Sequence, residues 1–220
     1  MGPPEVVLDR VVRVEIWSDV VCPWCYIGTT NLQTAIQRCD RQIDVVFRSY
    51  QLDPDAPDMP VPAVEYLAAR YGGGRDQALT MMRQVTAVAA SVGLQFRLED
   101  SLTGQTLDAH RVLHLAAQRD LQPPVAASLF AAHFTQNRSV FETESLTELA
   151  AEAGLDEDEV RAVLADGAYT DEVLADIRQA RAYGITGVPF FVFDGRYGVA
   201  GAQPPEVLGR VLATAAQANR

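Results

Sequence analysis

Hydrophobic and polar residues alternate at both ends of the chain and follow a helical period between them. Apolar side chains at every second position of 11–17 predict a strand with two unequal faces. The segment 22–40 predicts a helix, and the strand period returns in 43–47. Strand, helix and strand in this order form a β-α-β unit, so we expect two parallel strands with a right-handed crossover.

A loop rich in proline and aspartate, 52–62, follows this unit and marks a boundary. Beyond it the apolar residues keep a helical period for more than a hundred residues. One helix is predicted to end at Gly93, from apolar residues at every third or fourth position: Ala78, Met81, Val85, Val88 and Val92. Further helices are predicted around 107–115 and after Pro124, which suits a first helical turn.

The limits of the later helices are predicted from capping residues. A serine, threonine or aspartate followed three residues later by glutamate is typical of a helix start, and glycine is typical of a helix end. The predicted starts and ends are Ser145 with Glu148 and Gly154, Asp156 with Glu159 and Gly167, and Thr170 with Gly184.

The strand signals return near the end of the chain. Val188–Phe193 is an apolar run suited to a buried strand, and Asp194-Gly195 is typical of a hairpin turn before a return strand at 197–200. Pro204 and Pro205 then predict the start of a last amphipathic helix.

These elements predict an α/β fold with two parts. A framework formed by 11–60 and 180–217 carries an inserted α-helical domain, 61–179. The 220 residues carry a formal net charge of −11, which argues against nucleic acid or an anionic membrane as partner. Neither a secretory signal in 1–10 nor a membrane-spanning run is recognisable, so we expect a cytoplasmic protein whose thiols are kept reduced.

The sequence Cys22-Pro23-Trp24-Cys25 lies between the first predicted strand and the first predicted helix. A cysteine at a helix start meets unpaired amide hydrogens and the positive end of the helix dipole, which favours its thiolate. Cys25 lies one helical turn away, where it can attack a mixed disulfide formed by Cys22. Pro23 suits the first helical position, where the missing N–H costs nothing.

Two other interpretations of this pair remain open. A CxxC pair is half of a zinc site, although no second pair of cysteines or histidines stands at a similar spacing. The pair could also be inert. The remaining cysteine, Cys39, is expected to be a packed or half-exposed thiol without a redox role.

Two longer motifs resemble those of a known family. They are Ser18-Asp19-Val20-Val21-Cys22-Pro23-Trp24-Cys25-Tyr26-Ile27-Gly28, and Gly187-Val188-Pro189-Phe190-Phe191-Val192-Phe193 through Val199-Ala200-Gly201-Ala202-Gln203. With the predicted elements, they resemble the DsbA-like oxidoreductases, and within these the FrnE subgroup of polyketide-biosynthesis dithiol–disulfide isomerases. The resemblance extends over roughly 11–212 and implies a thioredoxin-like fold with a large α-helical insertion.

The resemblance also implies roles for individual residues. Cys22 is the implied nucleophile and Cys25 the resolving thiol, with Pro189 as a cis-proline opposite them. The implied substrate surface comprises Pro23, Trp24, Gly187, Val188 and Phe190. Unlike the periplasmic DsbA enzymes, this chain has no histidine between the cysteines, so we expect an intermediate redox potential.

Two further groups of polar residues are candidates for site chemistry. Glu15 and Asp19 flank the first strand, and in thioredoxin-like enzymes a carboxylate near the cysteines relays the proton of the resolving thiol; the alternative is a solvated strand charge. His110 and His114 share a helical face, but no third ligand accompanies them. We therefore expect packed or surface histidines and no metal.

The predicted function is that of a thiol–disulfide oxidoreductase or isomerase acting on disulfides of proteins or small thiols. Its only redox group is the Cys22–Cys25 pair, with glutathione as a candidate co-substrate and an unidentified thiol reductant or oxidant as recycling partner. One alternative is a glutathione-dependent enzyme like the 2-hydroxychromene-2-carboxylate isomerases and kappa-class transferases, which typically carry serine at the position of Cys22. The other is a holdase that binds clients around Trp24 and Phe190.

Overall fold

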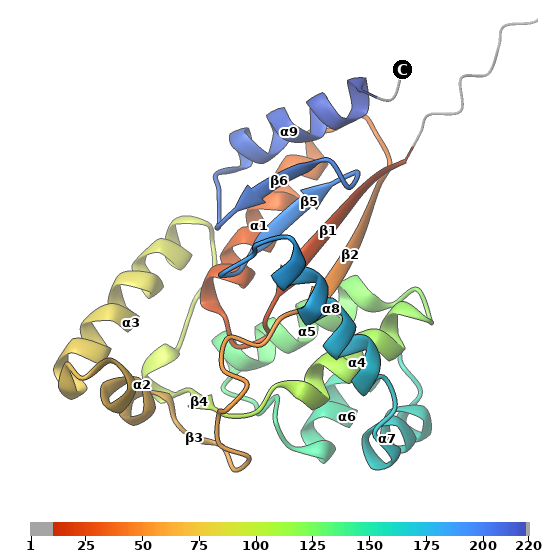
Figure 1. Cartoon of the computed structure of the whole chain (residues 1–220). Helices are drawn as coiled ribbons and strands as arrows, with labels where there is room; N and C mark the ends of the chain where they lie inside the picture. The colour runs from red at the N-terminus through yellow and green to blue at the C-terminus, as the bar shows by residue number, and fades with distance from the viewer. Residues whose placement is uncertain (1–10, 219–220) are drawn as a thin grey trace, which may run out of the picture.

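The computed structural model describes residues 11–218 and contains a central four-stranded sheet (Figure 1). The strand order is β2-β1-β5-β6, with β1 at Val12–Ser18, β2 at Ile43–Ser49, β5 at Phe190–Phe193 and β6 at Tyr197–Ala200. β1 is parallel to β2 and antiparallel to β5, and β5 and β6 form a hairpin. The predicted β-α-β unit and the predicted terminal hairpin are both confirmed.

Helices cover both faces of this sheet (Figure 1). On one face α1 (Pro23–Gln37) and α9 (Pro205–Gln217) pack together against buried residues of β1 and β5. On the other face lies α8 (Thr170–Ala182), which packs against β2. This arrangement explains the alternation in β1: Val14 and Ile16 face the first layer, and Trp17 is buried in the cluster of the second.

The remaining helices form the insertion between β2 and α8. They are α2 (Ala63–Tyr71), α3 (Gly74–Ser91), α4 (Leu107–Ala117), α5 (Gln122–Ala131), α6 (Thr143–Glu152) and α7 (Glu157–Asp166), with a 3-10 turn at Leu98–Asp100 and a π-helical turn at Ala132–Gln136. The predicted α/β fold with a large helical insertion is confirmed. The insertion is not wholly helical, because β3 (Val61–Pro62) and β4 (Leu102–Thr103) form a separate two-stranded sheet.

Some predicted helix starts are wrong. Helix α6 begins at Thr143, and Ser145 lies inside it, where its hydroxyl donates to the Ser139 carbonyl at 2.6 Å in place of capping the helix. Helix α5 begins at Gln122, two residues before Pro124. Thr170 is the first residue of α8 and not its N-cap; the N-cap position belongs to Tyr169, which has a left-handed conformation and makes no side-chain capping hydrogen bond.

One of the two interactions of the capping box predicted for α7 is present. The Asp156 carboxylate accepts a hydrogen bond of 3.0 Å from the Glu159 backbone N–H, as expected of an N-cap. The Glu159 side chain does not complete the box, because it forms an ion pair with Arg119 in the turn after α4. A tertiary contact therefore replaces the local one.

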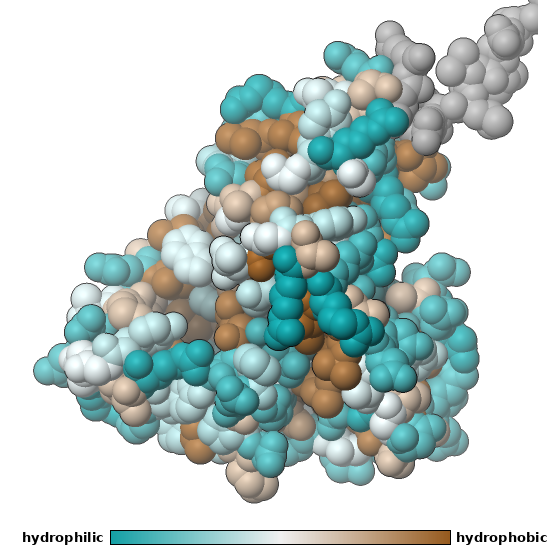
Figure 2. Space-filling model, viewed as in Figure 1, coloured by the Kyte–Doolittle hydropathy of each residue, from teal (hydrophilic) through white to brown (hydrophobic). Residues whose placement is uncertain are grey.

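The predicted division at residue 180 falls inside α8 and stays a prediction. This helix contacts both α4 of the insertion and β2 of the sheet, and the Trp17 indole N–H donates to the Asp176 carbonyl at 3.1 Å. Hydrophilic residues cover much of the face shown in Figure 2, with hydrophobic residues in short patches. Among the described helices, none combines the length and apolar composition needed to cross a membrane.

Candidate active site

Cys22 is the N-cap residue of α1, where its backbone is extended and Pro23 is the first helical residue. A tight turn places it there, because the Cys22 N–H donates to the Asp19 carbonyl at 3.0 Å. Cys25 continues into the helix, and its N–H donates to the Cys22 carbonyl, also at 3.0 Å. The dithiol is thus at a helix start, as the sequence predicts, and the helix amides favour a negative charge there.

The two thiols have different surroundings. Cys22 keeps 3% of its surface exposed, whereas Cys25 has none. Burial raises the pKa of the Cys25 thiol well above its ordinary value, and the hydrogen bond and charge of Cys22 raise it further. The Ser18 hydroxyl and the Asp19 backbone hydrogen-bond to Cys25 and act in the opposite direction. Cys25 is therefore a thiol that must lose a proton before it can react.

The Val188–Pro189 segment faces the cysteines from the end of the loop before β5. Its peptide bond is cis, as the resemblance implies. The Cys22 thiol donates to the Val188 carbonyl at 3.6 Å, so residues 166 positions apart meet at the site. The Gly201 N–H donates to the Pro189 carbonyl at 2.8 Å, which ties the segment to the residue after β6.

Gly28 allows α1 to approach this segment closely. A Cβ atom at Gly28 would lie 2.9 Å from Pro189 Cγ and 3.2 Å from Phe191 Cζ. Such distances are shorter than ordinary contacts between carbon atoms. Glycine is unfavourable inside a helix, so its place there is explained by this contact. Gly28 was noted in the sequence only as part of a motif, although a mid-helix glycine after CxxC is a signal of close packing.

Trp24, which lies between the two cysteines in the sequence, is an exposed apolar residue with 40% of its area accessible. Gly187 is exposed and Val188 and Phe190 are half-buried on the facing segment. Phe190 packs against the cluster that contains Trp17, on the α8 side of the sheet, whereas the cysteines belong to the core on the α1 side. The roles of the residues of the implied substrate surface stay predictions.

Comparison with known proteins agrees with this geometry. Residues 13–213 match the model of the DSBA-like thioredoxin domain. A probable DsbA oxidoreductase from Streptomyces coelicolor is 45% identical, with a TM-score of 0.88 over 95% of this chain and 91% of that one. The chain belongs to the DsbA-like thioredoxin family. Its fold is therefore thioredoxin-like, and it is an oxidoreductase in the general sense.

More distant relatives share the fold of this DsbA-like chain. The cytosolic disulfide reductase DsbM from Pseudomonas aeruginosa is 20% identical, with a TM-score of 0.67 over 94% of this chain and 99% of that one. The uncharacterised protein YwbO of Bacillus subtilis is 23% identical over 91% of this chain and 96% of its own length. These matches extend over nearly the whole chain, so they include the helical insertion.

The two candidate carboxylates of the DsbA-like site have different surroundings. Glu15 is held on the α8 side of the sheet by Arg48, whose Nη2 donates to Glu15 Oε1 at 2.6 Å. Asp19 lies beside the cysteines and is 1% exposed. Its Oδ2 accepts the Leu52 N–H at 2.8 Å, whereas Oδ1 accepts no hydrogen bond from the residues that the structure describes. The Asp19 backbone contacts the dithiol through the Cys22 N–H, and neither carboxylate is a solvated strand charge.

Two histidines of the insertion lie near Asp19. His110 of α4 has its Nε2 3.4 Å from Asp19 Oδ1 and 3.1 Å from the Tyr50 carbonyl oxygen. His133 lies in the π-helical turn, and burial lowers its pKa from 6.5 to about 4, with Asp19 acting weakly in the opposite direction. His133 is therefore neutral at pH 7. The sequence pattern could not reveal these contacts, because they join helices of the insertion to the turn before Cys22.

His110 and His114 do not share a ligand. His114 Nε2 lies 3.2 Å from Asp176 Oδ2 and the same distance from the Ser49 hydroxyl, on the α8 side. The described residues include no group of three or more histidines, cysteines or carboxylates able to hold a metal ion. Cys39 lies beyond the end of α1, half-buried, and the absence of a redox role for it stays a prediction.

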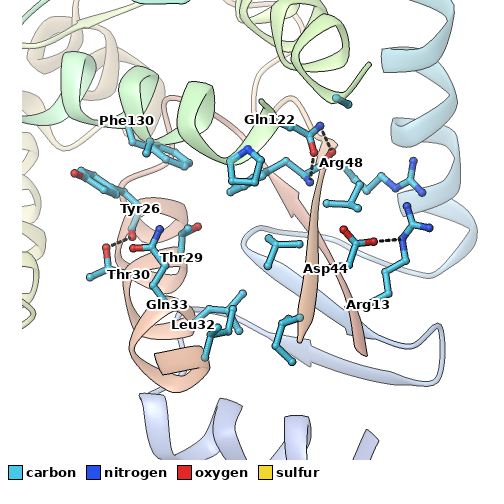
Figure 3. Close-up of a pocket in the computed structure, with 18 of the residues that line it drawn as sticks. Arg13, Tyr26, Thr29, Thr30, Leu32, Gln33, Asp44, Arg48, Gln122 and Phe130 are labelled. Atoms are coloured by element: carbon cyan, nitrogen blue, oxygen red, sulfur yellow. Dashed lines mark hydrogen bonds and ion pairs between the residues drawn. The ribbon is translucent and has the colours of Figure 1, made fainter. Parts of the chain in front are cut away.

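A large cavity lies away from the dithiol, between α1, β2 and α5 (Figure 3). It measures about 910 Å³, and no cysteine lines it. Gln122, which lines this cavity, hydrogen-bonds to the free edge of β2. Its Oε1 accepts the Phe47 N–H and its Nε2 donates to the Phe47 carbonyl, each at 2.9 Å. Ser49, two residues on, donates its N–H to Asp176 Oδ2 at 3.0 Å. We assign the chemistry to the dithiol, because size alone does not indicate a reactive group.

Proposed function

We propose that this chain is a thiol–disulfide oxidoreductase in which Cys22 attacks and Cys25 resolves. The observation that carries the proposal is the position of Cys22, at the start of α1 and facing the Val188 carbonyl, with Cys25 buried one turn deeper. A Cys22 thiolate attacks one sulfur of a substrate disulfide and releases the other as a thiolate. Cys25 then attacks Cys22, and the second substrate sulfur leaves as the Cys22–Cys25 disulfide forms.

Substrate recognition in this proposal depends on the backbone of Val188. No hydrogen bond within residues 11–218 involves the Val188 N–H, and its carbonyl faces Cys22. An extended substrate can therefore pair with this backbone while its apolar side chains contact Trp24 and Phe190. Such binding suits disulfides in flexible peptide segments. Whether oxidation, reduction or isomerisation dominates depends on the recycling thiol, for which glutathione is one candidate.

The proton of Cys25 needs an acceptor, and we assign it to the surroundings of Asp19. Asp19 is buried in the turn that leads into Cys22, whereas Glu15 is engaged by Arg48 on the α8 side of the sheet. A carboxylate with one unpartnered oxygen in a buried site is unfavourable unless a proton or a cation approaches it. This supports Asp19 and argues against Glu15 as the relay.

The assignment to the FrnE subgroup and the cytoplasmic location are parts of this proposal. The two end motifs support the first. The similarity to a cytosolic disulfide reductase supports the second.

A pair of single substitutions tests the division of labour. In a Cys39→Ser background, Cys25→Ser should accumulate a mixed disulfide with a peptide disulfide, because attack survives and resolution does not. Cys22→Ser should accumulate none. Intact-protein mass spectrometry measures the adduct, and equal adduct on both variants would contradict the order of events.

The same experiment separates the alternatives. A glutathione-dependent isomerase or transferase would bind the glutathione thiol without exchanging disulfides, so no adduct would form on Cys22. A holdase would suppress client aggregation equally well with both Cys22 and Cys25 replaced by serine. The intact dithiol favours redox chemistry over both.

A further inference from the structure

A small cavity of about 10 Å³ lies beside Ser18, whose hydroxyl acts against the rise in the pKa of the buried Cys25 thiol. Its polar lining includes Ser18, Ser49 and His110, and most of the remaining lining is apolar. A cavity of roughly 10–15 Å³ holds one water molecule, provided that two to four polar groups can bind it. The three polar side chains meet this requirement, and each is at most 4% exposed.

We propose that one water molecule in this cavity and the Ser18 hydroxyl conduct the Cys25 proton to His110 during resolution. The inference rests on the proposed function and names the groups that serve it. His110 belongs to α4, so the proton acceptor of the dithiol is supplied by the helical insertion and not by the thioredoxin-like framework.

The hydrogen bonds of His110 prepare it to accept a proton. Its Nε2 lies 3.1 Å from the Tyr50 carbonyl, and a carbonyl oxygen can only accept, so Nε2 carries a hydrogen. In the neutral ring Nδ1 is then the nitrogen that accepts a proton. The resulting imidazolium would lie 3.4 Å from Asp19 Oδ1, the buried oxygen that otherwise lacks a hydrogen bond. Asp19 thus acts through His110.

The other titratable groups nearby do not replace His110. Burial lowers the pKa of His133 to about 4 despite the opposing charge of Asp19, so His133 holds no proton at neutral pH. Arg48 lines the cavity as a permanent cation engaged by Glu15 and Asp176. His114 contacts the Ser49 hydroxyl on the far side of the cavity and is oriented by Asp176.

The step is balanced in protons and electrons. The Cys25 S–H proton passes to Ser18, the Ser18 hydroxyl proton to the water, and a water proton to His110. The electron pair left on Cys25 forms the bond to Cys22, and the Cys22–substrate bond breaks with its pair on the substrate sulfur. When a thiol reduces the Cys22–Cys25 disulfide, the proton returns to Cys25 along the same path.

Single-turnover kinetics with the small reagent dithiodipyridine tests the path in the Cys39→Ser protein. The first thiopyridone released reports attack by Cys22, and the second reports resolution by Cys25. His110→Gln retains an N–H donor for the Tyr50 carbonyl but cannot accept a proton. His114→Gln is the matched control, one turn further along the same helix.

We expect His110→Gln to slow the second release by roughly 10²-fold near pH 7 and to leave the first release unchanged. The deficit should shrink as the pH rises, because hydroxide then deprotonates Cys25 directly, a change that a structural defect would not produce. His114→Gln should resemble the parent in both phases. Ser18→Ala, a smaller change in the same path, should reproduce the slow second phase with its pH dependence.

Two results would overturn the path: a parent-like second phase in His110→Gln at every pH, or equal slowing by His114→Gln. A parent protein that forms no mixed disulfide with the reagent would instead refute the proposed function. The first release separates the two failures.

Discussion

Replacing Gly28 with alanine tests how closely α1 must approach the segment that faces the cysteines. The added Cβ would lie 2.9 Å from Pro189 Cγ, 3.2 Å from Phe191 Cζ and 3.4 Å from Ala202 Cα. A proline ring and a backbone atom cannot rotate away as a flexible side chain would. Either α1 or the Val188–Pro189 segment must therefore move, and the contact between Cys22 and the Val188 carbonyl would change with it.

Two opposing effects set the change in stability. Alanine in a helix interior is about 1 kcal/mol more favourable than glycine. Overpacking a tight contact costs roughly 1–3 kcal/mol. Gly209 in α9 supplies the matched control, because a Cβ there meets no heavy atom within 4 Å. Gly209→Ala should therefore stabilise the protein by about 1 kcal/mol, and Gly28→Ala should lie roughly 1–3 kcal/mol below it.

Thermal unfolding measures this difference directly. For a chain of this length, 1 kcal/mol corresponds to roughly 2–4 °C, so the two alanine variants should differ in Tm by roughly 2–12 °C. The first release from dithiodipyridine should also slow in Gly28→Ala alone, since only that change disturbs the surroundings of Cys22. If Gly28→Ala stabilises the protein as much as Gly209→Ala does, the close approach is not a constraint and the argument fails.

Three further predictions concern the thiols, His133 and Trp24. Iodoacetamide at about pH 6 should label Cys22 before Cys25 in the reduced protein, because burial raises the Cys25 pKa; peptide mapping that finds Cys25 first would refute this. As the pH falls from about 6.5 to about 4, the unfolded chain protonates His133 and the folded chain does not, so the free energy of unfolding should drop by up to about 3 kcal/mol. His133→Phe should remove this component from urea titrations, and an unaltered pH slope would exclude His133 as its source. Trp24→Ser should slow turnover of peptide disulfides but not of dithiodipyridine, with little change in Tm; equal losses on both substrates would mean that Trp24 is not a substrate contact.

The framework could be predicted from the sequence because its signals are local. The alternation in β1, the CxxC before a helical run and the Asp194-Gly195 turn each depend on neighbouring residues, and each predicted element is present. The two-residue strands β3 and β4 are too short to show a period, so the sheet inside the insertion was missed. At Ser145 a contact with Ser139 replaces the expected cap, which local pattern alone could not reveal.

The candidate site also combines residues that local sequence signals reveal with contacts that they do not. Cys22 and Cys25 are recognisable from their spacing and context, whereas the contacts of Asp19 with its partners depend on how the insertion docks. His110 lies 91 positions from Asp19, and no periodicity in either segment indicates the meeting. The sequence could supply the reacting sulfurs but not the groups that surround them.

The hydrogen bonds that Gln122 and Asp176 make to the edge of β2 have a consequence for any attempt to reduce this protein to a minimal domain. Gln122 and Asp176, which occupy the outward backbone groups of Phe47 and the Ser49 N–H, both come from the segment 61–179. Deleting that segment would leave an open strand edge, with unpaired donors and acceptors that can template pairing with another chain. The truncated protein should therefore self-associate through β2 even if its own sheet still folds. In this chain the inserted helices occupy part of the β2 edge, so the dithiol cannot be separated from them without a replacement for these contacts.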